Sequence, residues 1–108
     1  MTTPLPTPVA RLVDAVNRGD TDAFLALFPG DGRVDDWGRR FDGHDAIRAW
    51  SEREFTGANG TLTPRKVTTA GQTVTVDAAW KSNFYSGDSR FVFVVEGDGI
   101  HEMRIVAH

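Results

Sequence analysis

The sequence has 108 residues and a formal net charge of -3 at pH 7; 40% of its residues are hydrophobic and 25% are charged. This size and composition are typical of one globular domain, which we expect over residues 8–108 after a flexible segment 1–7. The sequence has no Lys/Arg cluster, no apolar run of about 20 residues, no signal peptide and no cysteine, which argues against nucleic-acid or membrane binding, excludes disulfides and favours a cytoplasmic location.

Two short helices joined by a tight turn are predicted at the start of the chain. Thr7 is the expected N-cap of the first helix, Pro8 its first helical residue, and Gly19 a natural stop. Asp20 is the expected N-cap of the second helix, which ends at Pro29. The apolar residues at helical spacing are Val9, Leu12, Val13 and Val16 in the first helix and Phe24, Leu25, Leu27 and Phe28 in the second.

A short extended segment and a third helix follow. The stretch PGDGR is typical of a turn, and residues 33–37 are predicted to be extended. A helix over residues 45–55 places Ala46, Ile47 and Trp50 on one face. Glycine and asparagine in residues 57–60 predict the end of this helix.

The last part of the chain has the pattern of an antiparallel sheet. The predicted strands are 61–69, 73–85, 89–96 and 100–107, separated by 70–72, 86–88 and 97–99. Connections this short favour antiparallel hairpins between neighbours.

The predicted strand 89–96 is apolar on both sides. Phe91, Phe93 and Val95 lie on one face, and Val92 and Val94 on the other. Such a strand requires cover on both faces. Because the three helices can cover one face only, we expect a second copy of the chain on the other, forming a homodimer through the outer sheet face.

Four short motifs stand in order along the chain. They are Ala15-Val16-Asn17-Arg18-Gly19-Asp20 followed by Ala23-Phe24; Val34-Asp35-Asp36-Trp37-Gly38; Gly43-His44-Asp45-Ala46-Ile47 with Trp50; and Gly99-Ile100 with Met103. Together with the order of the elements they resemble the nuclear transport factor 2-like superfamily, most closely its SnoaL-like branch of small bacterial proteins. The resemblance spans about Val9 to Ala107. It implies an α+β cone, in which three N-terminal helices pack on a curved antiparallel sheet around a mostly apolar pocket, and often a homodimer.

The resemblance also implies a role for Asp36. In isomerase-like members the residue at this position on the short strand is an aspartate that projects into the cone as a general base. An apolar environment disfavours the charged form of such a carboxyl and raises its pKa towards values useful in proton transfer. Alternation along the strand puts Asp35 and Asp36 on opposite sides, and the superfamily register leaves Asp35 exposed near an arginine. The alternative is that both aspartates lie on the surface and pair with Arg39 or Arg40.

Two other parts of the isomerase-like site do not match. The tyrosine that this resemblance places in the first helix is Leu12 here, and the second acid falls near Arg90 or Phe91. A base without an oxyanion hole lacks what is often the largest catalytic contribution, so steroid isomerisation by that machinery is not expected. The lone tyrosine, Tyr85, lies near a predicted strand end, and nothing in the sequence directs its hydroxyl.

Glu54 is a second candidate acid. It follows Trp50 by four residues on the same helix face, so an Asp36/Glu54 pair could share acid and base roles. The alternative is a solvated side chain at a frayed helix end.

His101 is a third candidate. It alternates with Met103 and Ile105, which predicts that it lies on the apolar face as a catalytic residue or as a hydrogen-bonded core residue. Together with His44 and His108 it shows no metal-ligand spacing, so we predict no metal and no cofactor.

Several large apolar side chains are expected to form the core, and some of them to contact a ligand. They are Trp37, Trp50, Phe55, Trp80, Phe93 and Met103. Trp37 is expected to point outward or to cover the mouth of the pocket.

These features favour a protein that binds a small apolar or aromatic metabolite inside the cone, with or without cofactor-free proton-transfer chemistry of the isomerase, cyclase or dehydratase type. In the catalytic hypothesis Asp36 is the base and His101 or Glu54 its partner. The alternative is a non-catalytic dimeric ligand-binding or interaction module. A buried Asp36 beside a continuous cavity would favour the enzyme, and a cavity filled by Trp50 and Trp80 would favour the module.

Overall fold

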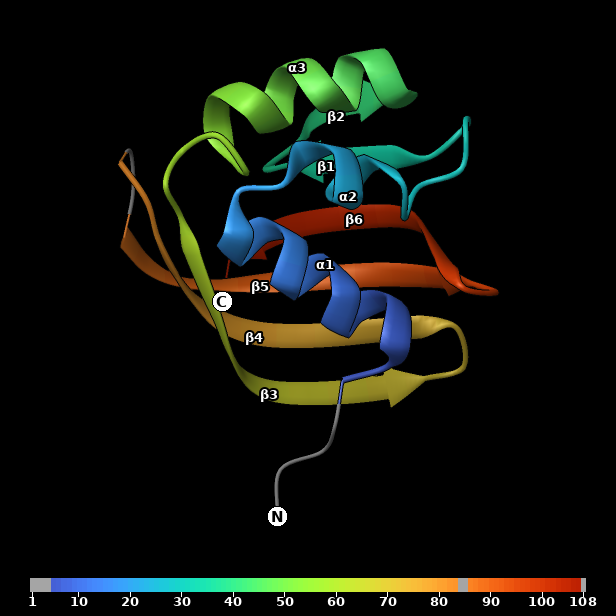
Figure 1. The fold of residues 1–108 in the computed structure, drawn as a ribbon. Coiled ribbons are helices and arrows are strands. Elements are labelled where there is room, and N and C mark those ends of the chain that lie inside the picture. Colours follow the sequence, from blue (N-terminus) through green and yellow to red (C-terminus); the bar gives the residue numbers. More distant parts are fainter. Residues whose placement is uncertain (1–4, 84–85, 108) are drawn as a thin grey trace.

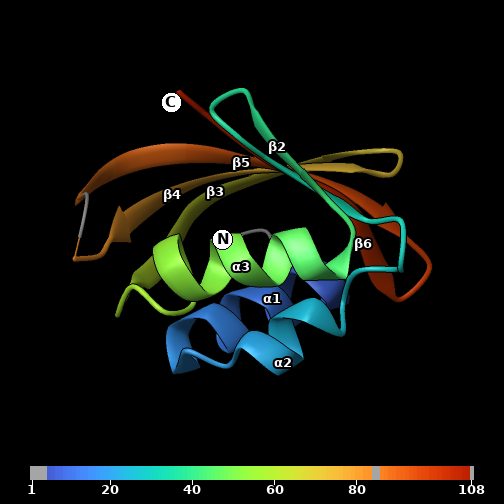
Figure 2. The ribbon, with the colours of Figure 1, turned by 90° about the horizontal axis from the view of Figure 1, so that it is seen from above.

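The computed structural model describes residues 5–83 and 86–107. Within them, three helices lie on the concave face of one curved sheet (Figure 1), and the sheet arches over all three when seen from above (Figure 2). The elements are α1 (Thr7–Arg18), α2 (Thr21–Leu25), β1 (Arg33–Asp36), β2 (Arg39–Asp42), α3 (His44–Glu54), β3 (Thr61–Ala70), β4 (Thr73–Lys81), β5 (Ser86–Glu96) and β6 (Gly99–Ala107). The predicted α+β cone is confirmed.

The strand order in the sheet is β2-β1-β6-β5-β4-β3. Consecutive strands form antiparallel hairpins, as their short connections predict. The pair β1–β6 is the one parallel pair of the described, otherwise antiparallel sheet, and it sets Asp36 opposite Ile105. Parallel neighbours need a long connection, and here α3 and β3 to β5 lie between them in the sequence. This pairing brings Asp36 beside the last strand of the chain.

The first two helices have the predicted turn chemistry. Gly19 closes α1 in the left-handed region at φ 68°, and Asp20 caps α2 by accepting a hydrogen bond from the Ala23 N–H at 3.0 Å. α1 begins at Thr7 with Pro6 as its N-cap, one residue earlier than predicted. α2 is shorter than predicted and ends at Leu25, because the chain turns there while Leu27 and Phe28 remain buried.

The hairpin of β1 and β2 contains a strand that was not predicted. Asp36 pairs with Arg39, so Trp37 and Gly38 are the two turn residues, at φ 55° and 89°. A two-residue turn with both φ values positive matches the right-handed twist of a hairpin. The Asp35 carboxylate accepts a hydrogen bond from the Gly38 N–H at 2.8 Å and stabilises the turn. A tryptophan at positive φ is uncommon, so the residues at 37–38 do not signal this turn.

Two predicted boundaries differ from the structure. β4 ends at Lys81 instead of residue 85, and β5 begins at Ser86, so residues 86–88 form part of a strand and not a turn. Residues 84 and 85, with Tyr85, lie outside the described residues, as do residues 1–4 and His108. The part of the expected flexible N-terminus that is described includes Thr7, which is helical.

The core lies between the helices and the sheet. Phe91 and Phe93 of β5 are buried on this side, whereas Val92 and Val94 are half-buried on the other. β5 is therefore apolar on both faces, as predicted. None of the described helices is long and apolar enough to cross a membrane.

Candidate functional site

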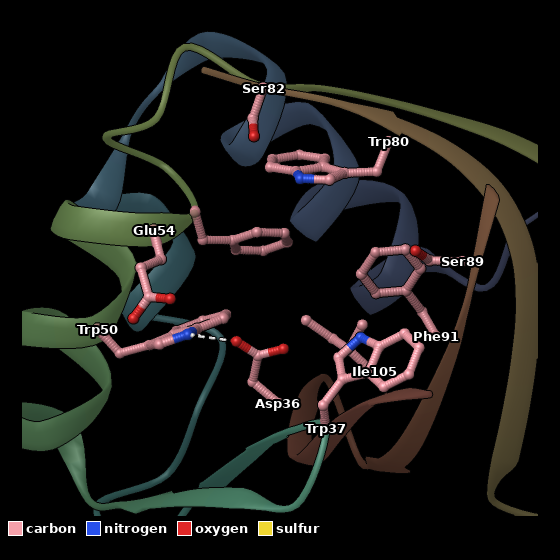
Figure 3. A pocket seen from close by; sticks show the side chains of 10 residues that line it. Asp36, Trp37, Trp50, Glu54, Trp80, Ser82, Ser89, Phe91 and Ile105 are labelled. Atoms are coloured by element: carbon pink, nitrogen blue, oxygen red, sulfur yellow. Dashed lines mark hydrogen bonds between the residues drawn. The ribbon is translucent and has the colours of Figure 1, made fainter. Parts of the chain in front are cut away.

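A pocket of about 250 Å³ remains at one end of the core, between α3 and the sheet (Figure 3). Its lining comes from the four inner strands of the sheet, β1, β6, β5 and β4, from α3, and from residues that directly follow β1, α3 and β4. The lining residues are Asp36, Trp37, Trp50, Glu54, Phe55, Trp80, Ser82, Ser89, Phe91 and Ile105. The parallel β1–β6 pair places Asp36 and Ile105 side by side at the floor of this pocket.

Aromatic rings in contact with one another form most of the wall. Phe55 packs on Trp50, Trp80 and Phe91, with ring centroids at 5.1, 4.9 and 6.3 Å. Trp80 in turn lies against the backbone of Gly60, where an added Cβ would stand 2.0 Å from its ring. Glycine at this position therefore gives the indole a place outside the pocket. The tryptophans border the cavity without filling it.

Asp36 is held with one carboxylate oxygen directed into the pocket. It shares a strand face with the fully buried Val34, and its side chain is 16% exposed. Its Oδ2 accepts hydrogen bonds from the Trp50 Nε1–H at 3.1 Å and from the Arg39 guanidinium at 2.5 Å. Oδ1 has no hydrogen bond to any described residue and points into the cavity (Figure 3). The two hydrogen bonds to Oδ2 hold the carboxylate in place and leave Oδ1 available to contact a ligand.

Glu54 reaches the same site from the end of α3. Arg39 bridges the two acids: its guanidinium donates to Glu54 Oε1 at 2.7 Å and Oε2 at 3.2 Å, and also to Asp36. The hydrogen bond from Arg39 lowers the pKa of Glu54, and burial opposes this effect. The hydrogen bonds to Glu54 and then Asp36 raise the pKa of Arg39. Glu54 and Arg39 are therefore both charged at neutral pH.

Ser89 is a lining residue that the sequence did not reveal. Only 3% of it is exposed, and its hydroxyl makes no hydrogen bond to any other described residue. In Figure 3 it stands on β5, across the pocket from Glu54. The predicted strand 89–96 already contains Ser89 on the face of Phe91 and Phe93, but nothing in the sequence marks this serine as a pocket residue. Arg39 was missed as a bridge between Asp36 and Glu54 because β2 was not predicted.

The structure brings together six of the predicted site residues and separates three others. Asp36, Glu54, Trp37, Trp50, Phe55 and Trp80 all line the pocket. Trp37 is 62% exposed and lies at the mouth, as expected. Phe93 and Met103 are fully buried in the core and do not line the pocket.

His101 does not lie on the apolar face, so that prediction is wrong. A bulge shifts the β5–β6 register between Val94 and Val95, and Ile100 and Met103 are both buried on either side of it. His101 is half-buried, outside the pocket, with Nδ1 3.6 Å from a carboxylate oxygen of Glu96. A bulge breaks the two-residue alternation on which the prediction depended.

Among the residues that the structure describes, no group of three or more His, Cys, Asp or Glu side chains is arranged so that it could hold a metal ion.

Comparison with known proteins gives one family and one fold. A family model for the SnoaL-like domain matches residues 9–107. A candidate polyketide cyclase from Sinorhizobium meliloti has a similar structure, with TM-score 0.84 and 27% identity over 94% of this chain and 95% of its own. A protein from Sphaerobacter thermophilus is 26% identical, with TM-score 0.75 over 91% of this chain and 90% of its own.

A third similar structure is a hypothetical protein with a ketosteroid isomerase-like fold from Catenulispora acidiphila, solved in complex with trimethylamine. It is 21% identical, with TM-score 0.82 over 95% of this chain and 86% of its own, and at this identity the likeness concerns the fold alone. No curated protein matches the chain.

Proposed function

The chain belongs to the SnoaL-like domain family, and we propose that it binds a small aromatic or apolar molecule in the pocket beneath α3. The family and the fold fit a ligand-binding, isomerase or cyclase role. The observation that carries the proposal is a cavity with aromatic walls in which two polar atoms, Asp36 Oδ1 and the Ser89 hydroxyl, have no hydrogen-bond partner among the described residues. No fully buried side-chain nitrogen or oxygen among the described residues lacks a partner, so both atoms are accessible from the pocket, where a ligand can form hydrogen bonds with them.

The volume of the pocket limits the ligand. A cavity of about 150 Å³ holds one benzene molecule, and drug-sized ligands occupy about 300–1,000 Å³. At about 250 Å³ this pocket has room for one or two rings. A four-ring steroid is too large for this volume, so the proposed ligand has fewer rings.

A collection of one- and two-ring compounds tests this proposal. Ligands should raise the melting temperature, and a concentration of 100 times Kd corresponds to about 2.7 kcal/mol of added stability. Ser89→Leu should fill the pocket and abolish the shift, whereas the matched change at an exposed position of the same strand, Ser86→Leu, should preserve it. A collection that stabilises neither the wild type nor Ser86→Leu would contradict the proposal.

A second candidate function is proton transfer with Asp36 as the base. It is favoured by the free Oδ1 atom in an apolar pocket, since general-base catalysis contributes about 10²–10⁴-fold when the base is positioned at the reacting proton. Leu12 has no polar hydrogen to donate to an oxyanion, and the hydroxyl of Ser89, which lines the pocket, can take that role. Glu54 is engaged by Arg39 and serves to hold that arginine near Asp36.

Hydrogen–deuterium exchange at carbon measures this activity directly. In D₂O, the wild type should accelerate loss of the NMR signal from the acidic C–H groups of 2-tetralone, a two-ring ketone. Asp36→Asn should reduce the enzyme-dependent rate by about 10²-fold or more, and Asp35→Asn should leave it unchanged. Equal rates for the wild type and Asp36→Asn would exclude this role.

We further propose a homodimer through the outer sheet face. Val92, Val94 and Val106 are half-buried there, around the Asp77–Arg90 ion pair. A standard interface buries about 1,600 Å² in total. Sedimentation should give a dimer at micromolar concentration and a monomer for Val92→Glu; a monomeric wild type would contradict the proposal.

A further inference from the structure

The charged side chains that line the pocket are both acidic. Asp36 and Glu54 are the ionisable lining residues in the described part of the chain. Arg39 pairs with both acids and neutralises one of their two negative charges. Its side chain is 53% exposed and is not among the lining residues. Two negative groups and one positive group leave one negative charge. Arg53 lies 3.7 Å from Glu54 but is well exposed, so solvent and salt screen its contribution.

The walls also favour positive charge. Five aromatic residues line the cavity, Trp37, Trp50, Phe55, Trp80 and Phe91. The face of an aromatic ring attracts a cation within about 6 Å, with about 0.5–2 kcal/mol depending on desolvation. An anionic ligand would meet these ring faces and two carboxylates, with no lining arginine, lysine or described lining histidine to pair with.

Two partnerless polar atoms show where a ligand would be held. Asp36 Oδ1 can only accept a hydrogen bond when the carboxylate is ionised, and its neighbour Oδ2 already has two donors. The hydroxyl of Ser89, a residue that is 3% exposed, is independent of the acidic pair, comes from a different strand and is directed into the same cavity (Figure 3). A ligand that donates to Asp36 at one end and meets Ser89 at the other satisfies both.

We propose that the ligand is a one- or two-ring molecule that carries a protonated amine. Its ammonium group donates to Oδ1 of Asp36, and its ring lies among the aromatic side chains. An alkyl amine has a pKa near the ~10.4 of lysine and is charged at pH 7. This inference rests on the proposed binding function and specifies the chemistry of the ligand. An ammonium group paired with Oδ1 occupies the atom that would accept the proton if Asp36 were a base. Tight amine binding would therefore argue against the second candidate function, proton transfer by Asp36.

Three compounds of nearly one shape and different charge test the inference. They are 2-phenylethylamine (positive), 2-phenylethanol (neutral) and phenylacetate (negative), titrated at pH 7 with the amide NMR spectrum as the readout. We expect the amine to bind at least tenfold more tightly than the alcohol, and phenylacetate to bind most weakly. An alcohol or an acid that binds as tightly as the amine would overturn the proposed charge while leaving the binding function intact. If none of the three binds at millimolar concentration, both proposals fail.

Matched variants test the assigned contact. Asp36→Asn should reduce the preference for amine over alcohol to less than threefold, because the ion pair is lost while the side-chain shape is kept. Asp35→Asn removes the same charge one residue away, where the side chain stabilises the β1–β2 turn, and should preserve the preference. Glu54→Gln should reduce the preference partly, and Glu52→Gln, an exposed site on the same helix, should not. An unchanged preference in a folded Asp36→Asn protein, verified by its amide spectrum, would overturn the assignment.

Discussion

The inner face of β5 passes from a closed core to an open pocket within a few residues. Phe93 is fully buried and stands opposite Val74 and Met103, which are large and apolar. Four positions earlier, Ser89 stands opposite Ala78 on β4. Both sets of side chains face the helices. The large side chains around Phe93 fill the space beneath the helices, whereas the small side chains of Ser89 and Ala78 leave a cavity. Small side chains in strand positions that would otherwise hold large ones are thus a direct cause of the pocket.

Phe91 lies between the two regions and connects them. Its ring stacks on Phe93 at 6.4 Å and contacts Phe55 at 6.3 Å on the pocket side. One side of this ring is therefore packed and the other borders the cavity. Substitutions of Phe91 and Phe93 therefore compare how much packing beside the pocket and packing in the closed core contribute to stability.

The largest expected difference is between these two phenylalanines. Phe93→Ala should lower the free energy of unfolding by about 3–5 kcal/mol, because it opens a void in a closed core. Phe91→Ala should cost at most about 3 kcal/mol, because this ring already borders a cavity. Urea unfolding measures both, provided that the m-value stays constant. Equal losses would mean that the pocket wall is packed as tightly as the core.

A smaller difference is expected between two buried serines. Ser51 is fully buried and bonds to the Thr56 hydroxyl at 2.8 Å, in a network that continues to Thr21. Ser51→Ala leaves Thr56 without this partner and should cost about 1–2 kcal/mol. Ser89→Ala removes a hydroxyl that has no partner among the described residues and should change stability by less than about 0.5 kcal/mol. A large loss for Ser89→Ala would show that this hydroxyl stabilises the fold.

The smallest expected effect on stability concerns the rim of the pocket, where an ion pair between Arg39 and Glu54 takes the place of apolar contacts. Arg39 lowers the folded-state pKa of Glu54 below its ordinary value of 4.5, so this pair stabilises the folded state above that pH. The contribution is lost as the pH falls through the lowered folded-state value. Because both side chains are partly exposed, we expect less than about 1 kcal/mol.

Carboxyl NMR titration measures the same interaction directly. Glu54 should titrate below 4.5 in the wild type, and Arg39→Gln should move its pKa back towards 4.5. If Glu54 titrates identically in both proteins, Arg39 does not hold the rim in solution.

The sequence by itself determined most of the helices and strands. Helical spacing, the caps at Gly19 and Asp20, and the two-residue period of the strands act between neighbours in the chain, so they can be read without knowing the fold. Val34 and Asp36 share a face for the same reason. Together with the ordered motifs, these local features were sufficient for the family and the α+β cone.

Tertiary structure decided which residues meet at the site. The Trp37-Gly38 turn, the strand after it and the bridge from Arg39 to Glu54 depend on a hairpin whose residues carry no common turn signal. The bulge beside His101 depends on the pairing of β6 with β5, and the small neighbour of Ser89, Ala78, depends on the pairing of β5 with β4. The alternation of buried and exposed side chains along one strand continues only while its pairing register with the neighbouring strand stays constant. Register is a property of two segments that can be distant in sequence.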